Sequence, residues 1–158
     1  MKTTTTQGSN TMEIGSLISG TLRPQDLIPA FIAELEYLDP GVSIEVPGRE
    51  ALPEDEASPW WQSEDAEALA EELIGLLNDI APAYTYFGAH HGDGADFGLW
   101  PDYAAIEYDI TDGCLVRLEA GDEPPESTAE YIEWNDHGNL AYYVKSESGK
   151  FIEKWSCV

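Results

Sequence analysis

The first half of the chain contains two stretches whose apolar residues recur at helical spacing. In the first stretch, apolar residues follow one another every three or four positions: Leu27, Phe31, Leu35 and Leu38. Such residues share one face of a helix. We expect Asp26 to cap this helix, with Pro29 tolerated in its first turn because the early amides have no intrahelical partner. The Asp39-Pro40-Gly41 sequence ends it. The pattern predicts an amphipathic helix that packs on the core.

The second stretch begins after Ser63, which is a good N-cap. Its apolar stripe comprises Leu69, Leu73, Leu76, Leu77 and Ile80. Glu64, Asp65 and Glu67 place negative charge near the positive end of the helix. Glu64, Glu67, Glu71 and Glu72 crowd much of the solvent side, with like charges at i, i+3 and i+4 spacing that mildly destabilise an isolated helix. This repulsion suggests that the charge itself is what the sequence maintains.

The connection between the two helices is predicted to be mostly irregular. A short strand is expected at Val42–Val46, followed by a loop that is marked by several prolines and contains Glu54-Asp55-Glu56. Trp60 and Trp61 close the loop and are expected to anchor it. The acidic run is interpreted either as solvated charge or as a protrusion that binds a partner.

From residue 83 onward, short aromatic and β-branched runs alternate with Gly and Asp, which is typical of antiparallel strands. A loop from His90 to Asp96 is expected to join the first two strands. Asp102 is a candidate cap for a helix over Tyr103–Ile110, with a strand as the alternative, and Asp112-Gly113 signals a turn. The expected strands are 83–89, 97–100, 115–118, 131–134, 140–144 and 151–157. The fold class predicted is α+β, with two to three helices packed on a meandering antiparallel β-sheet.

Domain organisation and location follow from length and from what the first residues lack. A chain of 158 residues is the size of one ordinary domain. We expect a disordered tail at 1–11 and a single α+β domain at 12–158. The tail has no apolar run, and no later window is long and apolar enough for a bilayer, so we expect a cytoplasmic protein without a signal peptide or a membrane partner. Cys114 and Cys157 are expected to be unpaired, buried in strands.

The net charge changes the picture most. The chain has 31 Asp and Glu against 7 Lys and Arg, a formal net charge of -24. Duplex DNA carries one charge per roughly 1.7 Å, so 24 charges correspond to about 40 Å of duplex. This is close to the diameter of about 40 Å that a compact chain of this length has. Such a surface attracts proteins built to hold nucleic acid and repels nucleic acid itself. Improved solubility and a high-salt host are the alternative explanations.

One cluster has the residue types of a metal site: His90, His91, Asp93 and Asp96. Its spacing matches neither HExxH nor an EF-hand loop. The alternative is a glycine-rich turn in which Asp93 and Asp96 cap their own backbone amides, with His137 in a separate hairpin. No nucleophile or phosphate-binding motif accompanies the cluster, so we expect no enzyme activity and no cofactor.

Aromatic residues are frequent in the second half, where they would form a stacking platform in a nucleic-acid-binding protein. They are Tyr84, Tyr86, Phe87, Trp100, Tyr131, Trp134, Tyr142, Tyr143 and Trp155. The scarcity of basic residues argues against direct nucleic-acid binding, because phosphate needs cations. We interpret these aromatics as core, or at most as a protein-binding patch.

Three segments carry a resemblance: TLRPQDLIPAFIAELEYLD at 21–39, YTYFGAHHGDGADFGLW at 84–100 and WNDHGN at 134–139. Together they resemble a group of small acidic proteins encoded by phages and plasmids, for which no activity or catalytic residue is established. The resemblance spans nearly the whole chain after residue 12. It implies a mobile-element context in which small acidic proteins often inhibit host defence, including anti-CRISPR and anti-restriction proteins.

The sequence therefore leads to one hypothesis and two alternatives. The hypothesis is a non-enzymatic DNA or RNA mimic that inhibits a basic nucleic-acid-binding protein or defence nuclease complex. Its candidate partner-binding residues are Glu54, Asp55, Glu56, Glu64, Asp65, Glu67, Glu71, Glu72, Asp122, Glu123 and Glu126. The alternatives are a metal-dependent enzyme or metal-binding module at His90–Asp96, and an acidic adaptor that binds a protein through its aromatic residues.

Overall fold

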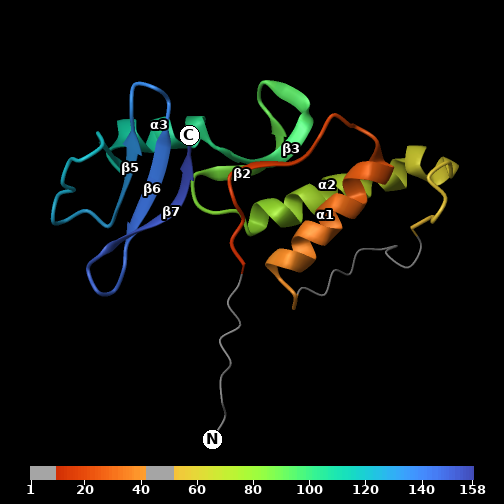
Figure 1. Cartoon of the computed structure of the whole chain (residues 1–158), viewed down its shortest axis with the longest axis horizontal. Helices are drawn as coiled ribbons and strands as arrows, with labels where there is room; N and C mark the ends of the chain where they lie inside the picture. Colours follow the sequence, from red (N-terminus) through yellow and green to blue (C-terminus); the bar gives the residue numbers. More distant parts are fainter. Residues whose placement is uncertain (1–9, 42–51) are drawn as a thin grey trace, which may run out of the picture. The chain divides into compact units, whose positions relative to one another are not determined.

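The computed structural model describes residues 10–41 and 52–158, and these contain three α-helices and two β-sheets (Figure 1). The α+β class is confirmed. The strand expected at Val42–Val46 and residues 1–9 of the expected tail lie outside the described residues. The described chain divides into two compact units. Unit 1 consists of residues 10–12, 16–41, 52–81 and 87–98, and unit 2 of residues 13–15, 82–86 and 99–158. The expectation of one domain at 12–158 stays a prediction.

Helix α1, Pro24–Leu38, begins three residues before the start predicted from the sequence. Arg23 is the N-cap residue, so the expectation that Asp26 caps the helix is wrong. Asp26 lies in the first turn and accepts a 2.6 Å hydrogen bond from the Thr21 hydroxyl. Pro29 consequently falls inside the helix, where it removes one backbone hydrogen bond. The apolar face compensates, because six of its side chains are buried: Leu27, Ile28, Phe31, Ile32, Leu35 and Leu38.

Helix α2, Glu64–Asp79, follows the short 3-10 helix η2, Pro59–Gln62. The Ser63 hydroxyl accepts a 3.3 Å hydrogen bond from the Ala66 amide, which confirms the predicted N-cap. The buried residues of α2 are Ala66, Leu69, Leu73 and Leu77. Ile80 was predicted to join this stripe but lies after the helix and is 43% exposed.

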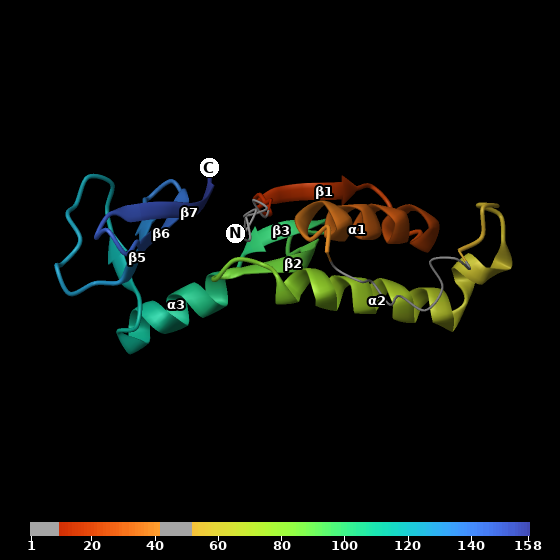
Figure 2. The same cartoon turned by 90° about the horizontal axis from the view of Figure 1, so that it is seen from below.

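Strands β1 (Gly15–Ser19), β3 (Asp93–Pro101) and β2 (Thr85–His90) form a three-stranded sheet in the order β1-β3-β2. Figure 2 shows α1 and α2 side by side next to it. The Phe31 ring of α1 packs on Phe87 and Phe97, with ring centroids 5.4 and 5.6 Å away. Strand β1 was not predicted, because its sequence GSLIS is short and mostly half-exposed or exposed.

Asn78, in the last turn of α2, ties this helix to β2. Its side-chain amide donates to the Phe87 carbonyl oxygen at 2.7 Å, and its side-chain oxygen accepts from the Phe87 amide at 2.8 Å. Both backbone groups of one strand residue are thereby satisfied by one side chain. This two-point contact fixes the C-terminal end of α2 within unit 1.

Unit 2 contains helix α3, Tyr103–Asp112. The Asp102 carboxylate accepts a 3.0 Å hydrogen bond from the Ala105 amide, so the helical alternative is correct. The helix ends at Gly113, whose φ of 81° is the left-handed conformation that favours glycine at a helix C-terminus. Asp112-Gly113 is thus a helix terminus that turns the chain into the next strand.

A four-stranded sheet follows, in the order β4-β5-β6-β7. Its strands are β4 (Val116–Leu118), β5 (Glu130–Trp134), β6 (Leu140–Lys145) and β7 (Phe151–Cys157). The β5-β6-β7 meander is antiparallel as predicted, whereas β4 pairs parallel to β5. The parallel pair arises because the long acidic loop after β4 carries the chain back before β5 begins. The strands therefore form two sheets, of which one is mixed, in place of one continuous meander.

The core of unit 2 joins α3 to one face of this sheet. Its buried members are Ile106, Leu115, Ile132, Leu140, Tyr142 and Trp155. The Trp155 indole nitrogen donates a 2.9 Å hydrogen bond to the Ala83 carbonyl oxygen, which satisfies its polar group. Within the described ranges, no helix is long and apolar enough to cross a membrane.

Candidate functional site

Between Glu64 and Glu72, helix α2 presents five exposed carboxylates: Glu64, Asp65, Glu67, Glu71 and Glu72. The opposite side of the helix is buried, so the core packing of Leu69 and Leu73 determines that these carboxylates face solvent. Glu64 and Glu72 are eight residues apart, or about 12 Å along the axis at about 1.5 Å per residue. Five charges over this length give one per about 2.4 Å. This lies between one strand of duplex DNA, about 3.4 Å per charge, and the whole duplex, about 1.7 Å.

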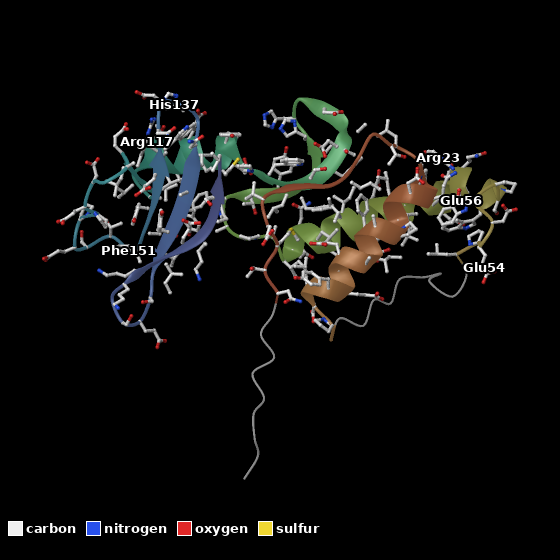
Figure 3. All side chains as sticks on the ribbon, viewed as in Figure 1. Arg23, Glu54, Glu56, Arg117, His137 and Phe151 are labelled. Atoms are coloured by element: carbon white, nitrogen blue, oxygen red, sulfur yellow. The ribbon has the colours of Figure 1, made fainter. Side chains whose placement is uncertain are left out.

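The acidic run Glu54-Asp55-Glu56 lies two residues before η2 and is held by hydrogen bonds to backbone groups. The Trp61 side chain is 3% exposed, and its indole nitrogen donates to the Asp55 carbonyl oxygen at 3.1 Å. The Asp55 carboxylate accepts from the Ala57 amide at 2.9 Å. Trp61 is thus the predicted anchor, while Trp60 is half-buried and contacts the Trp61 ring edge-on. Figure 3 shows Glu54 and Glu56 at the end of unit 1 that also holds Arg23.

The segment from Glu54 to Glu72 therefore holds eight carboxylates and no basic residue. We call it the acidic segment. Among the described residues, none of its carboxylates has a Lys or Arg nitrogen within 4.0 Å. The described part of unit 1 carries fifteen acidic residues and a single basic one, Arg23, which lies 3.7 Å from Asp26. Within the described part of unit 1, no cation pairs with the negative charge of the acidic segment.

The other three predicted partner-binding residues, Asp122, Glu123 and Glu126, belong to unit 2, in the loop between β4 and β5. The Asp122 carboxylate accepts from the Glu119 amide at 3.1 Å, so one of its oxygens stabilises the loop. Lys145 donates to the Glu126 carbonyl oxygen at 3.0 Å. The predicted residues thus fall into two sets, eight in unit 1 and three in unit 2.

The predicted loop from His90 to Asp96 is wrong, because only His91 and Gly92 separate β2 from β3. The rings of His90 and His91 stack with centroids 4.3 Å apart, and the His90 Nδ1 atom accepts from the Gly92 amide at 3.0 Å. Asp93 caps its own backbone by accepting from the Ala95 amide, as the alternative interpretation predicted. Asp96 instead accepts from the Ser16 hydroxyl of β1.

His90, Asp93 and Asp96 thus each engage a potential metal-ligating atom in a hydrogen bond within the protein. Over the described ranges 10–41 and 52–158, no group of three or more His, Cys, Asp or Glu side chains is placed to hold a metal ion. His137 lies in unit 2, in the turn between β5 and β6, where its backbone amide donates to the Asn135 side chain. The arrangement gives no support to metal chemistry at His90–Asp96.

Sequence reasoning missed a pair of tyrosine–carboxylate contacts inside unit 2. The Tyr84 hydroxyl donates to Asp109 at 2.8 Å, and the Tyr142 hydroxyl donates to Glu130. The two tyrosine rings meet edge-on with centroids 5.2 Å apart. Burial, strengthened by these hydrogen bonds to carboxylates, raises the pKa of both phenols well above the usual range. Tyr84 also has a φ of 62°, which is uncommon for a residue other than glycine.

No sequence signal identifies these pairs, because their members are 25 and 12 positions apart and belong to different elements. Neither tyrosine–carboxylate pair includes a Ser, Thr, Cys or Lys side chain that could act as a nucleophile.

Cys114 was expected to be buried in a strand, but it is exposed in the turn after α3. A hydrogen bond to the Asp112 carboxylate raises the pKa of its thiol, which opposes formation of the reactive thiolate. Cys114 and Cys157 are both unpaired, as predicted.

Of the aromatic residues singled out in the sequence, Phe87, Tyr131, Tyr142 and Trp155 are buried, and Tyr142 and Trp155 belong to the core between α3 and the four-stranded sheet. Tyr143 and Phe151 are half-buried on the four-stranded sheet, where both contact the Tyr131 ring. Because Tyr131 and Tyr143 alternate with the core residues Ile132 and Tyr142, they lie on the sheet face opposite α3.

Comparison with protein families, with curated proteins and with solved structures found no match to this chain.

Proposed function

We propose that this protein is a non-enzymatic inhibitor that occupies the nucleic-acid site of a basic host-defence protein, such as a CRISPR or restriction complex. The acidic segment takes the place of the phosphate backbone. The observation that carries the proposal is the set of eight exposed carboxylates, five of them on one helix, with no Lys or Arg nitrogen of the described residues 10–41 and 52–158 within 4.0 Å. The phage and plasmid resemblance is the reason for naming host defence.

Magnitudes indicate how such a surface would bind. An exposed ion pair contributes about 0 to 1 kcal/mol, so eight pairs give at most about 8 kcal/mol, which corresponds to a dissociation constant near 1 μM. No single carboxylate can dominate, and affinity must fall steeply as salt rises. Rigidity of α2 helps, because a carboxylate held in place by core packing loses less freedom on binding than one on a mobile loop.

A pull-down from host lysate tests the proposal. Tagged protein is incubated at low salt and eluted in parallel by rising salt and by excess duplex DNA or guide RNA. A nucleic-acid enzyme that elutes with both supports the proposal. A five-residue variant with Glu64, Asp65, Glu67, Glu71 and Glu72 changed to Gln or Asn should lose this protein.

The matched control neutralises five exposed carboxylates outside the acidic segment: Glu13, Asp39, Asp112, Glu119 and Glu147. It has the same net charge as the α2 variant and should retain the captured enzyme. Equal loss from both variants would show that total charge matters and the α2 surface does not, and the proposal would then fail.

A second candidate function is an acidic adaptor that binds a protein through the sheet face opposite α3. The rings of Tyr131 and Tyr143 stack there with centroids 4.8 Å apart, and Phe151 meets Tyr131 edge-on at 4.9 Å. Tyr143→Ala should then release the partner, and neither salt nor competing DNA should do so. The salt dependence of elution therefore separates the two candidates.

A further inference from the structure

Unit 2 has a groove between the C-terminal half of α3 and the turn that joins β5 to β6. Its volume is about 570 Å³, which is in the usual range for small-ligand sites. Side chains from three elements line it: Glu107 and Ile110 of α3, Arg117 of β4, and Trp134, Asn135 and Asp136 at the end of β5. Figure 3 shows Arg117 at the same end of the four-stranded sheet as His137, with Phe151 at the other end.

Arg117 is held in place at this groove by Trp134. Its guanidinium carbon lies 5.0 Å from the centroid of the Trp134 ring, and its Nη2 atom donates to the Trp134 carbonyl oxygen at 3.2 Å. No carboxylate of the described chain lies within 4.0 Å of its nitrogens. A guanidinium has five N–H donors in a planar fork that matches a carboxylate. Arg117 is thus a fixed cation with donors available to a ligand.

The other charges of the groove restrict which ligand can use those donors. Glu107 and Asp136 line the same space, so a doubly charged anion such as phosphate is repelled. A cationic group is attracted to the same two carboxylates. Ile110 and Trp134 provide apolar surface along which an aliphatic stem can pack. One carboxylate and one cation, joined by a short aliphatic chain, match this arrangement.

We propose that the groove binds a basic amino acid that has a free carboxylate, either as free arginine or lysine or as the C-terminal residue of a peptide. The ligand carboxylate pairs with Arg117, and the cationic side chain pairs with Glu107 and Asp136. The proposal does not depend on the inhibitor function, since the groove shares no residue with the acidic segment.

The test compares L-arginine with L-arginine amide, which lacks the carboxylate, so that its net charge is one unit more positive. The ¹⁵N-labelled full-length protein is titrated with each at about 0.15 M salt and followed by NMR. We expect arginine to bind about fivefold more tightly, the upper end for an exposed ion pair, with shifts at Thr111, Asn135 and Gly138. A surface that is merely acidic prefers the amide, so tighter binding of the amide, or shifts confined to α2, would overturn the proposal.

Variants locate the effect. Arg117→Gln should abolish the preference for arginine over its amide, whereas Lys154→Gln, which removes the same charge from an exposed position outside the groove, should keep it. A preference that survives Arg117→Gln with an intact spectrum would contradict the assignment. N-acetyl-arginine distinguishes the two sources: binding equal to that of arginine indicates a peptide C-terminus, and weaker binding indicates the free amino acid.

Discussion

The substitution Glu71→Lys is expected to stabilise the fold while it weakens partner binding. Glu71 is exposed on α2, four positions after Glu67, and the two like charges repel each other. A like-charge pair at this spacing costs about 0.2 to 0.5 kcal/mol, and a Glu–Lys pair in the same order gains a similar amount. The substitution should therefore raise the free energy of unfolding by about 0.4 to 1 kcal/mol.

Glu72→Lys is the matched control. Glu72 is equally exposed on the same helix, but the positions three and four residues away from it are Leu69, Ala68, Gly75 and Leu76, none of which is charged. The two substitutions change the net charge and the helix propensity identically. Any difference in stability between them therefore reports the interaction of position 71 with Glu67, which is repulsive in the wild type and attractive in the Lys variant.

The assay is urea unfolding followed by circular dichroism, with salt elution of the captured partner measured in parallel. We expect Glu71→Lys to be more stable than Glu72→Lys and both variants to elute at lower salt than wild type. Equal or reversed stabilities would refute the reasoning that α2 keeps repulsive charge at a cost to the fold. If Glu71→Lys gained stability without losing affinity for the partner, the negative charge of Glu71 would not contribute to partner binding.

Three further predictions concern the fold and its pH dependence. Burial raises the pKa of Glu34, so the folded state binds its proton more tightly than the unfolded state does, and stability falls as pH rises through this pKa. Glu34→Gln should therefore stabilise the protein at neutral pH and give no advantage in acid, as thermal melts at both pH values would show. Asn78→Ala should lower the free energy of unfolding in urea by about 1 to 3 kcal/mol, because it leaves the Phe87 backbone groups unsatisfied. A change near zero would show that the two-point contact between Asn78 and Phe87 does not stabilise the fold. Burial, followed by the charge of Glu133, raises the pKa of Tyr143 to about 12, so its stabilisation is complete below the ordinary tyrosine pKa of about 10 and is lost as pH rises toward 12. Tyr143→Phe should flatten this alkaline loss in melts, and an unchanged alkaline profile would contradict the assignment.

Local patterns in the sequence predicted the helices and most strands well. Ser63 identified the start of α2 because a capping hydroxyl and an apolar stripe agree there. The β5-β6-β7 meander followed from turn residues between short aromatic runs. Asp26 was wrongly predicted to cap α1 because a carboxylate in the first turn of a helix resembles a cap in the sequence. The loop at His90–Asp96 was wrongly predicted because its glycines suggested irregular structure, whereas the hairpin turn has only two residues.

Features that depend on distant contacts could not be read from the chain. The parallel pairing of β4 with β5 depends on where an acidic loop returns, and the split into two sheets depends on α3 standing between them in the sequence. The groove around Arg117 brings together residues of α3, β4 and the turn after β5, and no local pattern indicates that Glu107, Arg117 and Asp136 share one site. The acidic segment was found in advance because charge on a helix face is a local property.

The measurement that tests the central claim most directly is competition between this protein and duplex DNA for the captured nucleic-acid enzyme, across a range of salt concentrations. We predict that wild-type protein displaces labelled duplex, with an affinity that falls steeply with salt. The variant neutralised at Glu64, Asp65, Glu67, Glu71 and Glu72 should displace it weakly and with a shallower salt dependence. Simultaneous binding of protein and duplex, or displacement by the variant at wild-type affinity, would contradict the account.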